Sequence, residues 1–444
     1  MHLSRLFCAL LFTTCLVAAE TPTPKPPHIL FILADDFGCG DIGCYGGTDV
    51  PTPNLDRLAR EGIRFTQYYS ASPICSPSRC GLITGQFPAR WRITSYLQTR
   101  AGNRACGQAD FLDPAAPSLP RILKSAGYAT GHFGKWHLGG GRDVTDAPKF
   151  SAYGYDEHAS TYESPEPDPD ITSTKWIWAP TDKVKRWERT AFFVDKTLAF
   201  LAAHKSQPCF VNLWPDDTHT PWVPNAEAPK GDTPANLRPV LVEFDRQIGR
   251  LLDALHEQGL EENTLVIFAS DNGALPTFKG RRSGIFRGSK LSLHEGGIRL
   301  PLIVRWPGHI PAGRVDEQTV IGAVDLLPTL AAIAHAKLPE GIAFDGEDMT
   351  TALQGQPVTR TKPLLWEYGR NDKSFSYPAI PRDRSPNLAV REGPWKLLIN
   401  ADGTGTELFD VTTDRSEDTN VAAAHPEITE HLTHLLLDWR KSLP

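Results

Sequence analysis

The chain contains short, mainly apolar runs that each end in a cluster of polar residues, and the first of them is continuous. These runs cover residues 28–34, 128–133, 209–214 and 265–269. A run that is apolar at every position is typical of a parallel strand covered on both faces. Helical patterns lie between or near the runs, at residues 54–61, 119–126, 190–204 and 237–258. This alternation predicts an α/β fold whose doubly wound, mainly parallel sheet is flanked by helices.

The pattern changes after about residue 355. Short strand-like segments follow at residues 363–368, 387–390, 395–399 and 407–411. They precede an amphipathic helix at residues 426–441, whose apolar face holds Leu432, Leu435, Leu436 and Trp439. We therefore predict a large α/β domain over residues 28–355 and a smaller C-terminal α+β subdomain, built on an antiparallel sheet, over residues 356–444. A chain of 444 residues is long enough for both.

The N-terminus has the pattern of a signal peptide over residues 1–19. A basic start at Arg5 precedes an apolar run at residues 6–17 and a small-residue cleavage site at residues 17–19. The run is too short to cross a bilayer, and the Pro-rich residues 20–27 are typical of a linker. We expect a free exported protein, periplasmic or extracellular, without a membrane span. Six cysteines remain in the expected mature chain, and export would allow them to form three disulfides.

The overall charge indicates neither a nucleic-acid partner nor an anionic membrane surface. The chain has 46 basic and 52 acidic residues, a formal net charge of -6. An anionic substrate would therefore require a local group of cations.

The polar clusters share one position, directly after the predicted strands. Asp35 and Asp36 follow the first run, and Asp271 and Asn272 follow the last. Each pair taken alone is typical of a turn or a helix cap. Strand ends of a doubly wound sheet meet in one crevice, however, and several oxygen ligands there favour calcium or magnesium over a soft metal. The cysteine spacings do not match a structural zinc site.

The segment at residues 75–85, Cys-Ser-Pro-Ser-Arg-Cys-Gly-Leu-Ile-Thr-Gly, carries the most specific motif. It resembles the signature of the formylglycine-dependent sulfatases, arylsulfatase-like and glycan sulfatase-like members of the alkaline phosphatase superfamily. Ile83 stands where that family has Leu or Met. Blocks at residues 34–41, 52–59, 134–139, 270–273 and 288–301 resemble the family's other catalytic segments in order and spacing.

The resemblance implies a set of site residues and two non-protein groups. Cys75 would be oxidised to formylglycine by a maturation enzyme that reads the extended segment. One Ca²⁺ would be bound by Asp35, Asp36, residue 75, Asp271 and Asn272. Arg79 would orient the modified residue. The substrate sulfate and its bridging oxygen would be contacted by Lys135, His137, His219 and Lys290.

The same resemblance implies a sulfuric ester hydrolase. One hydroxyl of the hydrated aldehyde would attack sulfur, while His219, helped by Lys290, protonates the leaving oxygen. His137 would deprotonate the second hydroxyl so that sulfate is released. His219 lies beside Asp216 and Asp217, where the family has a plainer sequence, which leaves its assignment open. His294, before the Glu-Gly-Gly segment, is expected to be a packing or solvent-facing residue rather than a catalytic one.

The expected substrate is a sulfated carbohydrate, with an aryl sulfate as a simpler relative. Residues 90–104, with Arg92, Tyr96, Arg100 and Arg104, either line an outer pocket or form a solvated loop. A phosphate or phosphonate ester hydrolase of the same superfamily is an alternative, as is an inactive binder of sulfated glycans. The complete set of expected catalytic residues disfavours the inactive binder.

Overall fold

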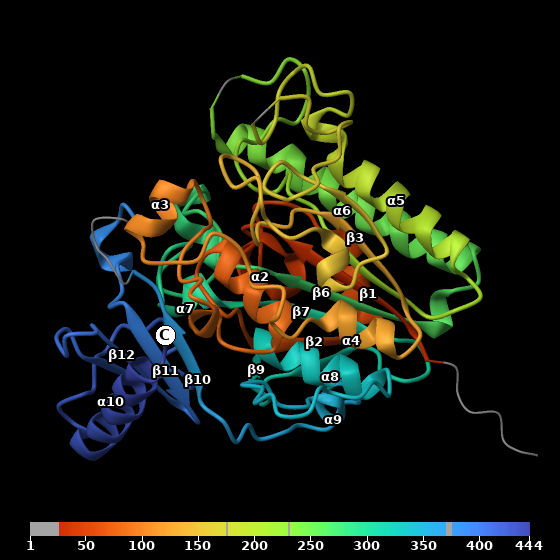
Figure 1. Ribbon diagram of the computed structural model, residues 1–444. Helices are drawn as coiled ribbons and strands as arrows, with labels where there is room; N and C mark the ends of the chain where they lie inside the picture. Colours follow the sequence, from red (N-terminus) through yellow and green to blue (C-terminus); the bar gives the residue numbers. More distant parts are fainter. Residues whose placement is uncertain (1–25, 175, 230, 370–374) are drawn as a thin grey trace, which may run out of the picture.

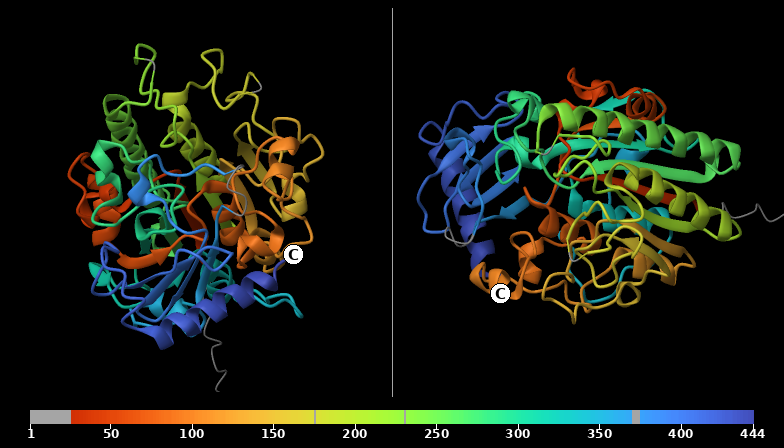
Figure 2. Two further views of the ribbon diagram at one scale, coloured as in Figure 1. Left: turned by 90° about the vertical axis from the view of Figure 1, so that its left-hand side faces the viewer. Right: turned by 90° about the horizontal axis from the view of Figure 1, so that it is seen from above.

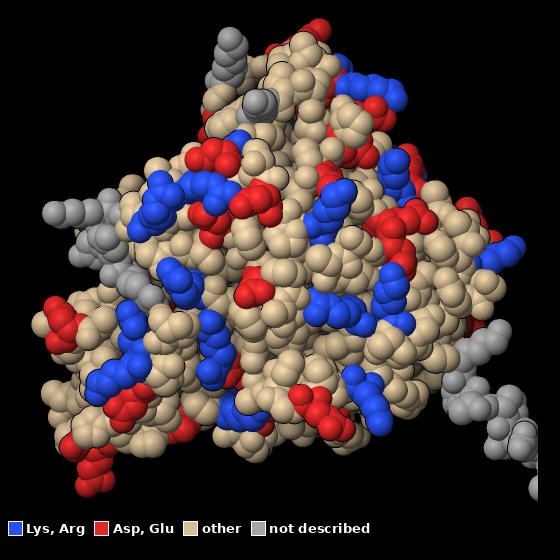
Figure 3. Space-filling model, in the orientation of Figure 1, with Lys and Arg blue, Asp and Glu red and all other residues tan. Residues whose placement is uncertain are grey.

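The computed structural model describes residues 26–174, 176–229, 231–369 and 375–444 (Figure 1). The predicted signal peptide, and all of the predicted linker except its last two residues, lie outside this part of the chain. Among the described residues, no helix is long and apolar enough to cross a membrane. On the face drawn in Figure 3, basic and acidic side chains are interspersed, which agrees with the small net charge.

A 9-stranded sheet forms the centre of the large domain. Its order is β4-β3-β5-β1-β6-β7-β2-β8, and β9 also pairs with β2. The strands are β1 His28–Ala34, β2 Ile63–Tyr69, β3 Ala129–Gly134, β4 Glu157–Ser160, β5 Cys209–Trp214, β6 Thr264–Ser270, β7 Arg299–Arg305, β8 Arg314–Asp316 and β9 Ile321–Gly322. The four predicted strands lie side by side and run parallel, whereas β7 is antiparallel to both of its neighbours. The predicted α/β class and mainly parallel sheet are confirmed.

Helices cover both faces of this sheet, as the fully apolar strands require. Alternate residues of β1 enter two separate cores, with Phe31 on one side and Leu30 on the other. The Phe31 side is covered by α2 Cys75–Thr84, α4 Leu119–Ser125 and α8 Leu326–Ile333. The Leu30 side is covered by α1 Pro53–Arg60, α5 Arg189–Ala203 and α6 Pro234–Glu257. The right-hand view of Figure 2 shows α5 and α6 together on one side of the sheet. Short helices are α3 Arg100–Ala105, α7 Glu295–Ile298 and α9 Thr350–Leu353.

A 4-stranded antiparallel sheet, β10-β11-β12-β13, lies in the C-terminal region (Figure 1). Its strands are β10 Leu364–Glu367, β11 Leu388–Glu392, β12 Trp395–Ile399 and β13 Glu407–Asp410, and α10 spans Pro426–Lys441. Leu432 and Leu436 of α10 are buried, and Leu435 and Trp439 pack beside them, as the amphipathic pattern predicts. The antiparallel C-terminal sheet is thereby confirmed.

No disulfide joins the six cysteines of the described chain. The disulfides that export would allow are therefore not formed. All of these cysteines except Cys44 are buried, and a buried free thiol generally packs as a small apolar side chain. Cys209 illustrates this, since it lies in a hydrophobic core, with its Sγ 3.7 and 3.6 Å from the backbone oxygens of His204 and Gln207.

Candidate active site

The carboxyl ends of β1, β5 and β6 are tied together by hydrogen bonds from the polar residues that follow them. The Asp35 N–H donates to Thr218 Oγ1 at 3.1 Å, and the Phe37 N–H donates to Ser270 Oγ at 3.0 Å. Asp36, which has a positive φ of 60°, donates its N–H to Asp271 Oδ1 at 3.2 Å. The predicted crevice is thus a tightly bonded edge of the sheet, in which the strand-end carboxylates converge.

Cys75 begins helix α2 at this edge. The helix ends at Gly85, whose φ of 65° suits a left-handed cap. The Cys75 Sγ lies 3.7 Å from Asp35 Oδ1 and 3.4 Å from Lys135 Nζ. Burial raises the pKa of the Cys75 thiol to about 12, although Lys135 and Lys290 act in the opposite direction. The unmodified thiol is therefore neutral and a poor nucleophile at physiological pH.

Three buried cations surround the carboxylates. Arg79 donates from Nε and Nη2 to Asp271 Oδ2 at 3.0 and 2.7 Å. Lys135 Nζ donates to Asp35 Oδ2 at 2.7 Å, and Lys290 Nζ donates to Asp36 Oδ2 at 2.7 Å. No basic residue is adjacent to these acids in the sequence, and the compensating charges come from distant segments of the chain.

The carboxylates titrate differently because these cations are unequally placed. Burial acts to raise the pKa of Asp35, but Lys135, His219 and Arg79 hold it well below its usual range. Burial and the neighbouring Asp35 raise the pKa of Asp271 to about 7, against the effect of Arg79.

The residues at this edge fit a hard divalent cation. One ligand atom from each of Asp35, Asp36, Cys75 and His219 lies within 4.8 Å of the others. Asn272 adds Oδ1, a buried acceptor without a hydrogen-bond partner in the described structure, while its Nδ2 donates to Asp36 Oδ1 at 2.7 Å. Asp271 lies against Asp36 and Arg79. Buried oxygens of this kind are the ligands that calcium prefers, so Asp35, Asp36 and Asn272 fit such a cation. His219, and not the predicted Asp271, belongs to the group of clustered ligand atoms.

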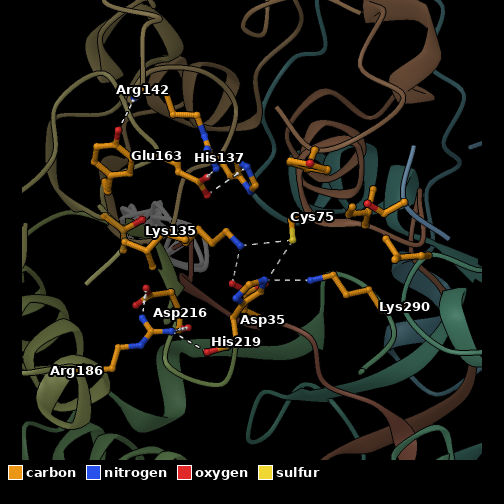
Figure 4. A pocket seen from close by; sticks show the side chains of 17 residues that line it. Asp35, Cys75, Lys135, His137, Arg142, Glu163, Arg186, Asp216, His219 and Lys290 are labelled. Atoms are coloured by element: carbon orange, nitrogen blue, oxygen red, sulfur yellow. Dashed lines mark hydrogen bonds and ion pairs between the residues drawn. The ribbon is translucent and has the colours of Figure 1, made fainter. Parts of the chain in front are cut away.

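His219 lies on the opposite side of the cavity from Glu163 (Figure 4), and Lys290 approaches its outer nitrogen. Its Nδ1 is 2.5 Å from the Thr220 carbonyl oxygen, and its Nε2 is 3.1 Å from Lys290 Nζ. Because a carbonyl only accepts, the hydrogen of the neutral ring is on Nδ1 and the Nε2 lone pair faces Lys290. Burial and the nearby Lys290 lower the pKa of His219.

The two acidic residues before His219 belong to a separate structural network. Asp216 accepts hydrogen bonds from Arg186 and Arg189, and Asp217 accepts from the Thr190 hydroxyl at 2.6 Å. Both carboxylates are buried, and Asp216 also lines the cavity. They anchor the loop that carries His219 to the start of α5, and they therefore do not displace His219 from the position that its motif predicts.

His137 has a partner that the motifs did not identify. Its Nε2 lies 3.2 Å from Glu163 Oε2 and 3.1 Å from the Leu97 carbonyl oxygen. Both neighbours accept, so Nε2 carries the hydrogen and the buried Nδ1, which has no partner in the described structure, keeps its lone pair. Burial, reinforced by Lys135 and opposed by Glu163, lowers the pKa of His137 to about 3. The ring is therefore a neutral base at physiological pH.

Glu163 is itself fixed by Arg142, whose Nη2 donates to Glu163 Oε1 at 2.6 Å. Burial acts to raise the pKa of Glu163, but His137, Lys135 and Arg142 lower it to about 2. Both residues lie in loops without a recognisable motif. The only signal in the sequence was the acidic, Pro-rich composition around Glu163.

These side chains enclose a cavity of about 280 Å³. Its lining, drawn in Figure 4, includes Asp35, Cys75, Lys135, His137, Arg142, Glu163, Arg186, Asp216, His219 and Lys290. From the segment at residues 90–104 only Tyr96 belongs to the lining. Arg92 and Arg104 are exposed, and Arg100 forms ion pairs with Asp110 and Asp146.

His294 lies outside the cavity, in the contact between the large sheet region and the C-terminal region. It is fully buried, and its Nδ1 is 3.4 Å from Glu417 Oε2. This position agrees with the predicted packing role.

Comparisons with known proteins find matching family models and similar proteins. A family model described as sulfatase matches residues 27–336, and a model described as N-sulphoglucosamine sulphohydrolase, C-terminal, matches residues 284–442. An N-acetylgalactosamine-6-O-sulfatase of Bacteroides thetaiotaomicron is 29% identical, over 93% of this chain and 93% of the relative. Arylsulfatase A of Bos taurus is 32% identical, over 97% of this chain and 84% of the relative.

Solved structures with a similar fold cover most of this chain. A sulfatase from the metabolism of multiple glycosaminoglycans by Bacteroides thetaiotaomicron has a TM-score of 0.77 and 27% identity, covering 93% of this chain and 98% of the other. Ps i-CgsB, solved in complex with k-i-k-neocarrahexaose, has a TM-score of 0.74 and 26% identity, covering 94% and 93%.

Proposed function

The chain belongs to the sulfatase family and is a sulfatase, and from this premise we propose that it hydrolyses sulfate esters of carbohydrates with the aid of calcium and formylglycine. The observation that carries the proposal is the group of three buried cations, Arg79, Lys135 and Lys290, around Cys75 at the cavity. Three cations balance the carboxylates of Asp35, Asp36 and Asp271. A bound divalent cation would therefore make the site net positive, which suits an anionic ester.

Two groups complete the proposed site. Formylglycine at position 75, made by a maturation enzyme, supplies an aldehyde carbon that a thiol lacks. Calcium, held by Asp35, Asp36, Asp271 and Asn272, supplies positive charge and Lewis acidity. Cys75 is only 2% exposed in the folded chain. We therefore propose that the maturation enzyme acts before the chain folds, while residues 75–85 are still extended.

The protein's own side chains bind the ester and move protons. Lys135 and Lys290, at 5% and 8% exposure, present ammonium groups to the cavity and neutralise charge on the sulfuryl oxygens. Arg79 donates from Nη1 to the Lys135 carbonyl oxygen at 2.6 Å, and so positions that segment as well as Asp271. His137 accepts a proton at Nδ1. The pair of Lys290 and His219 provides a proton for the leaving oxygen.

The proposed substrate is a sulfated carbohydrate with its sulfate in the 280 Å³ cavity. Support comes from relatives that are N-acetylgalactosamine-6-sulfatases and from the neighbour that binds a neocarrahexaose. The cavity holds a sulfate and part of one sugar ring, so the rest of a longer glycan must extend outward. We also propose that the protein is exported, to the periplasm or the extracellular space, where sulfated polymers are met.

The test uses protein coexpressed with a formylglycine-generating enzyme. We expect release of sulfate from an aryl sulfate and from sulfated sugars such as N-acetylgalactosamine 6-sulfate, with loss of rate in EGTA and recovery with calcium. The matched aryl phosphate should react far more slowly. Faster turnover of the phosphate would favour the phosphatase alternative, and sulfate release from aryl sulfates alone would exclude the carbohydrate assignment.

A further inference from the structure

A second cavity, of about 600 Å³, lies next to the active-site cavity and has a tryptophan-rich lining. Its walls include Trp178, Trp187 and Trp222, together with Pro180, Pro221 and Pro229. We call it the tryptophan cavity. It has the volume of a small-molecule site, and the proposed reaction does not use it.

The two cavities share their walls. Ile177, Arg186 and His219 line the active-site cavity, and residues one or two positions further along the chain, Trp178, Trp187 and Pro221, line the tryptophan cavity. Arg186 binds two of these stretches together, since its Nη2 donates to the His219 carbonyl oxygen at 2.8 Å. A single layer of chain therefore separates the two cavities.

Hydrogen bonds hold part of the lining of the tryptophan cavity in place. Asn236 of α6 donates from Nδ2 to the carbonyl oxygens of Trp222, Pro229 and Gly231 at 3.1, 2.9 and 3.0 Å. The Trp222 Nε1 donates to the Thr218 carbonyl oxygen at 2.9 Å, which fixes the indole ring. A ligand would therefore meet a preformed surface, and little conformational entropy would be lost on binding.

The lining combines flat apolar faces with a few polar groups. Indole rings offer broad apolar faces that suit the C–H face of a sugar ring, and their N–H groups can bind its hydroxyls. The Nε1 of Trp178 is a buried donor without a partner among the described residues. Lys185 uses two of its ammonium hydrogens on the Pro180 and Asp182 carbonyl oxygens, at 2.9 and 2.5 Å, and has a third for a ligand.

We propose that the tryptophan cavity binds a further sugar ring of an oligosaccharide substrate, one that lies beyond this layer of chain, while the active-site cavity holds the sulfated ring. This inference rests on the proposed carbohydrate sulfatase function. It adds that the enzyme distinguishes oligosaccharides from monosaccharides at a site separate from the chemistry, through Trp178 and Trp187.

The test compares Trp178→Ala and Trp187→Ala with Trp176→Ala. Trp176 belongs to the same segment, is 54% exposed and lines neither cavity, so it is a matched control. Sulfate release is measured from N-acetylgalactosamine 6-sulfate, from a chondroitin 6-sulfate tetrasaccharide and from an aryl sulfate. If the panel above identifies another sugar as the better substrate, its monosaccharide and tetrasaccharide replace the first two.

Both cavity variants should raise KM for the tetrasaccharide about tenfold, with less than about twofold change for the monosaccharide and the aryl sulfate. Trp176→Ala should change none of them. An unchanged KM for the tetrasaccharide in both cavity variants would overturn the inference. So would a loss confined to the aryl sulfate, because the cavity would then hold an apolar aglycone.

The alanine variants could lose activity on every substrate, and Trp178→Phe is then the variant to measure. This change keeps an apolar ring and removes the N–H donor. If Trp178→Phe retains aryl sulfate activity, a raised KM for the tetrasaccharide supports the inference and an unchanged KM overturns it. Failure of the proposed function looks different, because the wild-type protein would then release sulfate from no sugar of any length.

Discussion

The Nε2 of His137 lies 3.2 Å from Oε2 of Glu163, and this buried contact decides which nitrogen of the ring can accept a proton. Glu163 lines the cavity, but both of its oxygens are already occupied, Oε2 next to His137 and Oε1 by the hydrogen bond from Arg142. We infer that Glu163 is a positioning residue. It holds the hydrogen of His137 on Nε2 and so leaves the Nδ1 lone pair free for the reaction.

Glu163→Gln should lower kcat about tenfold or more and change KM little. The amide has nearly the same size, but it can turn its NH₂ group toward His137 and stabilise the wrong tautomer. Glu166→Gln is the control, because Glu166 is partly exposed and does not line the cavity, although its Oε2 accepts the Phe150 N–H at 3.2 Å and its Oε1 lies 3.6 Å from Lys149 Nζ. Steady-state kinetics on an aryl sulfate would measure both. Equal kcat values for the two variants would contradict the positioning role.

The same histidine predicts a loss of stability in acid. Burial lowers the pKa of His137 from its ordinary 6.5 to about 3, so the unfolded chain binds a proton more readily than the folded chain. The neutral His137 ring therefore makes its full contribution to the free energy of unfolding above pH 6.5, and this contribution falls as the pH decreases toward 3. Between pH 7 and 5 this amounts to about 2 kcal/mol.

Urea denaturation of the wild type and His137→Gln at pH 7 and pH 5 would measure this effect. The wild type should lose more unfolding free energy on acidification than the variant, which has no ionisable group at this position. Equal losses of unfolding free energy in the two proteins would show that His137 does not cause the pH dependence of stability.

The sequence predicted the elements that have strong local signals. The fully apolar run of β1 could only be a strand with a helical layer on each face, and residues 395–399 and 426–441 coincide with β12 and α10. Lys135 and Lys290 were identified because their motifs resemble a family. Glu163 and Arg142 were missed because their function depends on a contact between loops, which no local pattern encodes.

Cys75→Ser should fold but fail to turn over repeatedly. The serine side chain offers one hydroxyl oxygen, whereas release of sulfate through formylglycine requires a carbon that can carry two. Coexpression with a maturation enzyme, followed by mass analysis of the peptide that contains residue 75, should show an aldehyde in the wild type and an unmodified serine in the variant. Sustained turnover by the serine variant, or an intact thiol in active wild type, would refute this chemistry.

Asp271→Asn should reduce activity far more than stability. The change removes the charge that Arg79 binds at 2.7 Å and weakens a proposed calcium site, while the oxygens of Asp35, Asp36 and Asn272 remain. We expect a rate reduced about a hundredfold, with partial recovery in excess calcium. Thermal melting with and without EGTA should show a larger chelator effect in the wild type than in the variant. A wild type that is insensitive to EGTA in both melting and rate would argue against the metal.

Lys396 connects the C-terminal sheet to the segment that carries Lys290, and its removal should affect both stability and rate. Its Nζ is fully buried and lies 2.9 Å from Glu295 Oε1 and 2.9 Å from Glu417 Oε1. Glu417 also accepts the Glu295 N–H at 2.6 Å, at the end of the segment from residue 288 to residue 295. The C-terminal region therefore holds the backbone that presents Lys290 to the cavity.

Lys396→Met would leave two buried carboxylates without their shared cation, which costs about 3–5 kcal/mol. Lys441→Met is the matched control, because its pair with Asp438 is on the surface and contributes less than about 1 kcal/mol. At a temperature where both variants are folded, only Lys396→Met should lower kcat, since only this change loosens the segment that carries Lys290. If Lys396→Met lowers the melting temperature but leaves kcat unchanged, Lys396 only stabilises the fold. The C-terminal region would then have no effect on the catalytic rate.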